Sequence, residues 1–250
     1  MQEILDSLLG LAHELGRAES KLSILGEGNV SAKLSTTEFL VKASGSTLGT
    51  LAVDDLTQCQ SEPVLRLLER KSVSDAETET ILLEARVKPG AKKPSTETVF
   101  HAWLLTMKNI HFVGHCHPAS ANQVLCSPRA RDFAERRLFP DEVVCCGSAS
   151  VFVPYTDPGL PLAREIRDRA NFFIQQHGGV PRLILLQNHG IIALGATPQA
   201  VSACIHMASK AAEIFVGAAA LGGPNFMSAK DVERISSRPD EVYRQRQLKL

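Results

Sequence analysis

The chain has 250 residues, of which 44% are apolar and 22% are charged, the composition of an ordinary globular protein. Its 27 basic and 27 acidic residues give a formal net charge of zero. This balance argues against binding to nucleic acid or to a membrane surface, because both need a basic excess. The sequence has no apolar run of about 18 residues, the length that would predict a membrane span. Six cysteines without a C-x-x-C pair, and a start without a basic region, predict a cytoplasmic protein with free thiols.

Hydrophobic periodicity predicts the elements of the first half. Residues 2–15 carry apolar residues at helical spacing. The β-rich pieces within 24–46 are separated by Gly, Asn and Ser, which predicts strands joined by turns. Residues 61–93 are polar and predict a surface segment with a short helix and a strand. A helix is expected to begin near Ser95 or Thr96, with Glu97 in its first turn.

The second half predicts alternating strands and helices. The last long helix has Thr197 as its N-cap and Pro198 at its first position. The other predicted elements are a strand over 110–118, helices over 128–137 and 159–178, strands over 142–153, 182–187 and 191–195, and a partly helical tail over 221–250. No repeat or linker divides the chain, which predicts one domain over 1–250 with its core at about 5–220.

The sequence His115-Cys116-His117 is the first candidate site. Residues two apart on a strand project from one face, so both imidazoles can reach one cation, while Cys116 points to the other face and packs as a small apolar residue. Imidazole suits zinc, and also manganese, iron or nickel. The alternative is two strand-end histidines without a metal.

His189 lies in the turn Asn188-His189-Gly190 between two apolar strands. It is either a solvated turn residue or a third neutral ligand. Three histidines would leave coordination positions open for a substrate, the arrangement of a catalytic metal site.

The segment Pro94-Ser95-Thr96-Glu97 is either an ordinary helix start or an anion site. In the second reading, free N–H groups and hydroxyls bind a phosphate, and Glu97 lies beside the metal as proton acceptor and donor. Two glycine-rich turns, over 26–31 and 43–46, would let the backbone approach a ligand closely. Lys42 or Lys33 would add positive charge.

These motifs resemble the class II aldolase/adducin family, which includes fuculose-phosphate and rhamnulose-phosphate aldolases and ribulose-phosphate 4-epimerase. The sequences GEGNVS, KASGS, PSTETVFH, HCHP and LLQNHGII occur in the order and spacing of that family. The similarity covers about residues 5–220. It implies a three-layer α/β/α fold with a mostly antiparallel central sheet, and a homotetramer with sites between subunits.

The resemblance also implies roles for individual residues. The metal ligands would be His115, His117 and His189, with zinc as the expected ion and manganese or another divalent ion as an alternative. Glu97 matches the acid/base glutamate. The phosphate-binding positions match Asn29, Ser44, Gly45, Ser95 and Thr96.

Site residues distinguish this chain from two branches of the family. The histidines and Glu97 argue against the non-catalytic adducin branch, and Glu97 separates the chain from the 4-epimerases, which have Asp there. The aldolases also use a tyrosine from a neighbouring subunit as a proton donor. The best-aligned place here reads LFPDEVV, with Asp141, and Tyr155 lies further on.

The leading hypothesis is therefore a metal-dependent aldolase that cleaves a small sugar or sugar phosphate through a metal-stabilised enediolate. A decarboxylase of the same fold would form the same species by releasing carbon dioxide. The third hypothesis is an adducin-like binding protein without activity.

Overall fold

One sheet of seven strands runs through the computed structural model, which describes residues 1–249. The strand order is β3-β2-β1-β4-β7-β6-β5. Only β5 and β6 pair in parallel, which confirms a mostly antiparallel central sheet. The strands are β1 (Asn29–Lys33), β2 (Glu38–Lys42), β3 (Leu56–Gln60), β4 (Phe112–Cys116), β5 (Val151–Val153), β6 (Leu183–Leu186) and β7 (Gly190–Gly195).

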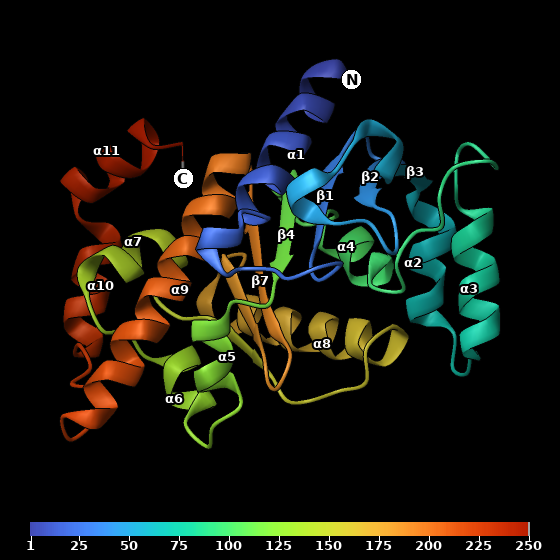
Figure 1. The fold of residues 1–250 in the computed structure, drawn as a ribbon. Helices are drawn as coiled ribbons and strands as arrows, with labels where there is room; N and C mark the ends of the chain where they lie inside the picture. The colour runs from blue at the N-terminus through green and yellow to red at the C-terminus, as the bar shows by residue number, and fades with distance from the viewer. Residues whose placement is uncertain (250) are drawn as a thin grey trace.

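Helices cover both faces of this sheet and give the predicted α/β/α layers (Figure 1). One layer holds α1 (Gln2–Leu15), α5 (Ala119–Leu125), α6 (Ala130–Glu135) and α9 (Pro198–Ala220), and the other holds α2 (Ser61–Glu69), α3 (Asp75–Glu84), α4 (Thr98–Leu104) and α8 (Leu160–His177). A flanking group holds α7 (Pro140–Cys146), α10 (Ala229–Ser237) and α11 (Pro239–Gln247).

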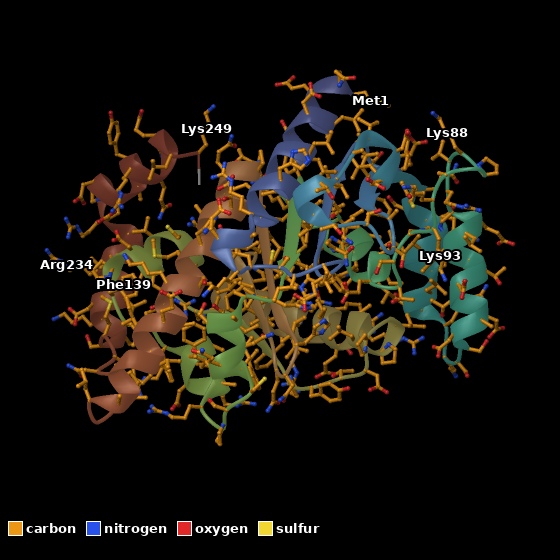
Figure 2. All side chains as sticks on the ribbon, in the orientation of Figure 1. Met1, Lys88, Lys93, Phe139, Arg234 and Lys249 are labelled. Atoms are coloured by element: carbon orange, nitrogen blue, oxygen red, sulfur yellow. The ribbon has the colours of Figure 1, made fainter. Side chains whose placement is uncertain are left out.

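Strand alternation divides the buried side chains between two cores. On β4, Cys116 joins the core with α1 and α9, whereas Val113 joins the core with α4 and α8. Cys116 therefore packs away from the face of His115, as predicted. Charged side chains lie around the rim, with Lys88 and Lys93 at one end and Arg234 at the other (Figure 2).

Three long helices confirm their sequence signals. Helix α1 matches the predicted range. Helix α8 ends at Gly178, whose φ of 69° is left-handed, a conformation that glycine adopts without strain. Helix α9 begins with Pro198, and the hydroxyl of Thr197 accepts a hydrogen bond from the N–H of Ala200 at 3.0 Å.

The predicted strand over 142–153 is wrong in its first half, where helix α7 forms. Pro140 occupies the first helical turn, followed by Asp141 and Glu142, and all three favour a helix N-terminus. Val143 and Val144 then pack against α10. Only the short β5 remains as a strand.

Two other predictions differ from the structure. Residues 61–93 contain the two helices α2 and α3 and no strand, and β3 precedes them. Helix α4 begins at Thr98, later than expected, so Glu97 is its N-cap and lies outside the first turn. No helix within residues 1–249 is both long and apolar enough to span a membrane.

Candidate functional site

The sequence motifs meet at one edge of the sheet because β1, β4 and β7 are antiparallel neighbours. The start of β1, the end of β4 and the start of β7 must then lie at the same edge. The register pairs Asn29 with His115 and His115 with Ile192. His117 follows the end of β4, and His189 precedes the start of β7.

The three histidines converge at this edge. Nε2 of His115 lies 2.9 Å from Nε2 of His117, and one ligand nitrogen from each of the three rings lies within 4.8 Å of the others. The side chain of His115 is fully buried, and those of His117 and His189 are 22% and 15% exposed. The cluster is therefore reached from solvent past His117 and His189.

The donor set fits one divalent cation. Two nitrogens bound to zinc at about 2.0–2.1 Å lie about 3.3 Å apart in a tetrahedral site. Nδ1 of His115 donates to the carbonyl oxygen of Ile191 at 2.9 Å, which leaves the Nε2 lone pair free for a metal. Burial, together with His115 and His189, lowers the pKa of His117 to about 3, so that ring is neutral at pH 7, as a ligand must be.

Gly190 has no side chain, and this absence makes room for the ring of His117. A Cβ on Gly190 would lie 2.7 Å from Cδ2 of His117 and 2.5 Å from the carbonyl oxygen of Cys116. The turn before β7 therefore excludes any larger residue after His189. Asn122 holds the same turn by donating to the carbonyl oxygen of His189 at 3.1 Å.

Glu97 lies beside the histidines, and its side chain makes no capping hydrogen bond to α4. Its Oε1 is 3.5 Å from Nε2 of His115 and 3.4 Å from Nε2 of His189. Its Oε2 accepts a hydrogen bond from Nδ2 of Asn29. One carboxylate oxygen is thus fixed by Asn29, and the other faces the histidine cluster.

Glu97 interacts electrostatically with the two histidines next to it. Burial alone would raise the pKa of Glu97, but His115 and His189 lower it well below its usual range. Conversely, burial would lower the pKa of His115, and the carboxylate of Glu97 raises it. An ionised carboxylate next to the ligand nitrogens can accept a proton at neutral pH.

The other predicted anion-binding residues also lie together. An antiparallel bridge joins Ala43 to Pro94, and the N–H of Ser44 donates to the carbonyl oxygen of Lys93 at 2.8 Å. This bridge places the turn Ser44-Gly45 beside Ser95-Thr96, and Gly45 has the left-handed φ of 80°. Helix α4 has only seven residues, so its dipole adds little, and hydroxyls and loop N–H groups remain as donors.

Of the two candidate lysines, only Lys42 lies at this edge. It is 2% exposed, and its Nζ donates to the carbonyl oxygens of Gly26 at 3.2 Å and Ser46 at 2.6 Å. Lys42 thereby ties the two glycine-rich turns together. Lys33 ends β1 at the opposite edge of the sheet.

Asp141, at the place aligned with the aldolase tyrosine, and Tyr155, further along the chain, both make other contacts. Asp141 lies on α7 and accepts a hydrogen bond from Arg244 at 2.8 Å. Tyr155 is 59% exposed, and its hydroxyl donates to Asp157 at 3.3 Å. Its N–H donates to the side chain of Gln187 at 3.4 Å, which places its loop next to the His189 turn.

Sequence reasoning missed a buried pair beneath the site. Nδ1 of His101 lies 2.7 Å from the hydroxyl of Ser31, and within residues 1–249 its Nε2 has no hydrogen-bond partner. Ser31 shares a strand face with Asn29, so β1 contacts Glu97 and His101 from one side. The signal in the sequence was the spacing of Glu97 and His101, one helical turn apart.

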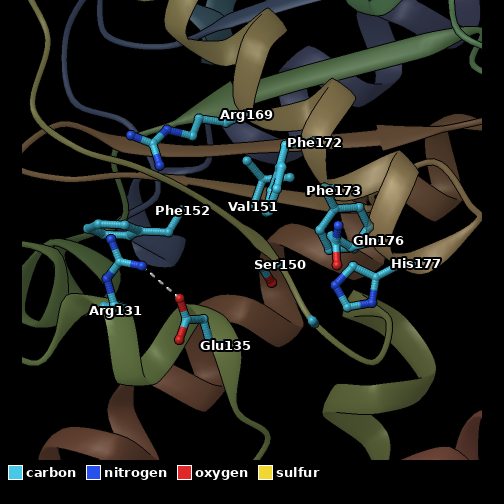
Figure 3. Close-up of a pocket in the computed structure, with 11 residues that line it drawn as sticks. Arg131, Glu135, Ser150, Val151, Phe152, Arg169, Phe172, Phe173, Gln176 and His177 are labelled. Atoms are coloured by element: carbon cyan, nitrogen blue, oxygen red, sulfur yellow. Dashed lines mark hydrogen bonds and ion pairs between the residues drawn. The ribbon is translucent and has the colours of Figure 1, made fainter.

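A separate surface pocket lies between α6, β5 and α8. Its volume is about 260 Å³, and Arg131, Phe152 and Phe172 line it (Figure 3). It contains none of the predicted site residues, and both of its arginines pair with glutamates. The histidine edge is therefore the candidate site.

Comparison with known proteins assigns the family. The family described as "Class II Aldolase and Adducin N-terminal domain" matches residues 9–216. The chain belongs to the class II aldolase/adducin family.

Two relatives show the range of functions within it. The 3-oxo-tetronate 4-phosphate decarboxylase of Haemophilus influenzae is 29% identical over 188 residues, 73% of this chain and 74% of that protein. The "uncharacterized oxidoreductase YuxG" of Bacillus subtilis is 26% identical over 182 residues, 70% of this chain. The chain spans only 24% of the length of YuxG.

Solved structures agree with the fold. The N-terminal class II aldolase domain of a conserved protein from Thermoplasma acidophilum has a TM-score of 0.68 at 25% identity, over 85% of this chain and 93% of that one. An L-fuculose 1-phosphate aldolase has a TM-score of 0.68 at 17% identity, over 94% of this chain and 95% of that one. At 17% identity the second likeness shows the fold alone.

Proposed function

We propose that the protein is a metal-dependent carbon–carbon lyase that cleaves a small hydroxy-carbonyl sugar or sugar phosphate. The observation that carries this proposal is the convergence of three histidine ligand nitrogens beside one ionised carboxylate, Glu97. An adducin-like binding protein would need no such set.

The metal ligands would be His115, His117 and His189. A divalent cation, which we expect to be zinc, would supply a Lewis acid that polarises the substrate carbonyl. The three histidines would hold this cation, and a substrate would reach it from solvent past the partly exposed His117 and His189.

Glu97 would move the proton. Asn29 fixes Oε2, so Oε1 is the oxygen that accepts a proton from the substrate and returns it. Its lowered pKa keeps it in the basic form before reaction. Ser44, Gly45, Ser95 and Thr96 would hold a phosphate or another anionic end of the substrate, with the N–H groups and hydroxyls of two adjacent turns.

Release of an aldehyde is the reaction indicated by the motif resemblance. It takes a proton from a substrate hydroxyl and delivers one to carbon. Glu97 can serve both steps in turn, because the aldehyde leaves between them.

Decarboxylation is the second candidate, and the H. influenzae relative favours it. Loss of carbon dioxide leaves a carbon that needs one proton, which Glu97, ionised before reaction, would take up from solvent and pass on. The hydroxyl of Tyr155, the nearest tyrosine in sequence to the aligned place, bonds to Asp157. A site with one proton-transferring carboxylate is sufficient for this reaction.

Metal analysis tests the proposed ligands, and a product assay then tests the proposed reaction. Purified protein should hold about one divalent ion per chain, and H117A should lose it. A screen of free and phosphorylated sugars and sugar acids should then yield either an aldehyde or carbon dioxide. Equal metal content in the native protein and H117A would contradict the proposed ligands.

The assembly is a further part of the proposal. The resemblance implies a homotetramer with sites between subunits, and light scattering of the purified protein measures the mass directly.

A further inference from the structure

The two ring nitrogens of His117 face different partners. Its Nε2 lies 2.9 Å from Nε2 of His115, on the side where the ligand nitrogens converge. Its Nδ1 lies 4.0 Å from Oε1 of Glu27. The carboxylate of Glu27 therefore lies on the outer side of this ring, away from the proposed metal position.

Glu27 is held in place by its own turn. Its Oε2 accepts a hydrogen bond from the N–H of Ile24 at 2.9 Å, and its own N–H donates to the carbonyl oxygen of Ile24 at 3.1 Å. The next residue, Gly28, has φ of 74°, and a Cβ there would lie 2.6 Å from the carbonyl oxygen of His115. The turn therefore packs closely against β4. Because Oε2 is bonded to Ile24, Oε1 is the carboxylate oxygen of Glu27 that faces His117.

Two of the three proposed ligands, His115 and His117, differ in the partner of their outer nitrogen. Nδ1 of His115 donates to a neutral backbone carbonyl, that of Ile191. Nδ1 of His117 faces a carboxylate instead. A carboxylate that accepts the outer N–H of a histidine fixes its tautomer and makes the other nitrogen a stronger ligand.

We propose that Glu27 is a positioning residue for the metal, a role that rests on the proposed function. Its carboxylate accepts the Nδ1 proton of His117, after a small rotation or through one water, and keeps the lone pair on Nε2. Glu27 touches neither substrate nor metal and acts only through His117.

The test is the zinc dissociation constant, measured at pH 7 by competition with a chelator. In E27Q the amide oxygen keeps the bond to Ile24, and the NH₂ group turns toward Nδ1 of His117. That group donates to Nδ1, which forces the proton onto Nε2 and removes the ligand lone pair. We expect E27Q to bind zinc about 10- to 100-fold more weakly than the native chain.

Two further variants separate positioning from a structural role. E27A loses the bond to Ile24 as well as the carboxylate, so a merely structural role predicts weaker zinc binding in E27A than in E27Q. Positioning predicts that E27Q is at least as weak as E27A. The matched control is E19Q, because Glu19 is an exposed carboxylate eight residues earlier in the chain, and its affinity should equal that of the native protein.

The outcomes distinguish this inference from the proposed function. If H117A loses zinc while E27Q binds within about threefold of the native chain, the metal site stands and the role of Glu27 is wrong. If E27A binds zinc more weakly than E27Q, Glu27 only shapes its turn. If H117A binds zinc as tightly as the native chain, the proposed metal site fails, and the role of Glu27 fails with it.

Discussion

Two buried charged clusters of this protein differ in how completely their polar atoms are paired. Between α6 and α7, Arg137 and Glu142 are 1% and 3% exposed and lie 3.7 Å apart. Arg137 also donates to the carbonyl oxygen of Gly147 and the hydroxyl of Ser150, both at 2.7 Å. Glu142 accepts from the N–H of Leu138 at 2.7 Å.

The cluster at the sheet edge is only partly paired. Within residues 1–249, Oδ1 of Asn29 has no hydrogen-bond partner, and the ligand nitrogens of His115, His117 and His189 face one another. Buried polar groups are normally satisfied, so this unpaired amide oxygen beside three converging histidine nitrogens supports the proposed ligand site. The Arg137–Glu142 cluster thus satisfies its own charges, whereas the edge cluster leaves three histidine nitrogens directed at the proposed metal position.

The largest effect should come from Glu97 in the partly paired cluster. E97Q keeps the shape of the side chain and can still accept from Asn29, but it cannot take up a proton. We expect turnover to fall by about two to four orders of magnitude with metal content unchanged. A fall of less than about tenfold on a true substrate would place the base elsewhere.

Substitutions in the Arg137–Glu142 cluster should lower the free energy of unfolding rather than turnover. R137A leaves Glu142 buried without its partner, which should cost about 3–5 kcal/mol of unfolding free energy. The double variant R137M/E142M removes both charges and should cost less than the single one. Denaturant unfolding measures both, and the metal content per folded chain should not change. A double variant less stable than R137A would contradict this.

The next prediction concerns His101, which belongs to neither cluster. Burial lowers the pKa of His101 to about 3, below about 6.5 for an unfolded histidine. Its contribution to stability is therefore complete above about pH 6.5 and is lost as the pH falls from there toward 3. Between those values the unfolded chain binds one proton more, which costs about 1.4 kcal/mol per pH unit.

H101Q should remove this slope while its amide bonds to Ser31. Unfolding free energies of H101Q and the native chain, measured between pH 6 and 4.5, should converge as the pH falls. Parallel pH profiles would show that His101 binds its proton equally in the folded and unfolded chains, which would contradict this prediction.

The smallest effect should come from the hydroxyls of Ser95 and Thr96. Inorganic phosphate should compete with substrate, seen as a rise in apparent KM, and the double variant S95A/T96A should weaken that competition by about tenfold. The double variant S35A/T37A is the control, since its hydroxyls lie in the turn at the other end of β1. If phosphate does not compete and free sugars react as well as phosphates, the proposed anion site is wrong.

The segment around α7 shows where sequence reasoning failed. The run Val143-Val144-Cys145-Cys146 has the β-branched, apolar character of a strand, and it forms a helix. The helix-favouring residues Pro140 and Asp141 precede the run. Glu142 is buried against Arg137, and this contact could not be read from local pattern because burial of a glutamate depends on its partner.

Glu97 shows a second limit of prediction from local sequence patterns. The motif identified the residue, but local rules placed it in the first helical turn, where its charge would favour the helix dipole. In the structure it precedes α4 and turns toward Asn29 and His115, which are 68 and 18 residues away in sequence. Long-range contacts override a preference worth at most about 1 kcal/mol.

The family, the long helices, and the histidines at a strand end and in a turn could all be predicted from the amino-acid sequence. These features depend on short-range periodicity, on turn chemistry and on motifs that contain their own residues. The antiparallel pairing of β1, β4 and β7, in contrast, became visible only in the folded chain. That pairing brings Asn29, Glu97 and the histidines to one edge, and it gives His115 the carbonyl of Ile191 and His117 the carboxylate of Glu27 as outer partners. Such contacts depend on register between strands distant in sequence, which no local pattern of residues encodes.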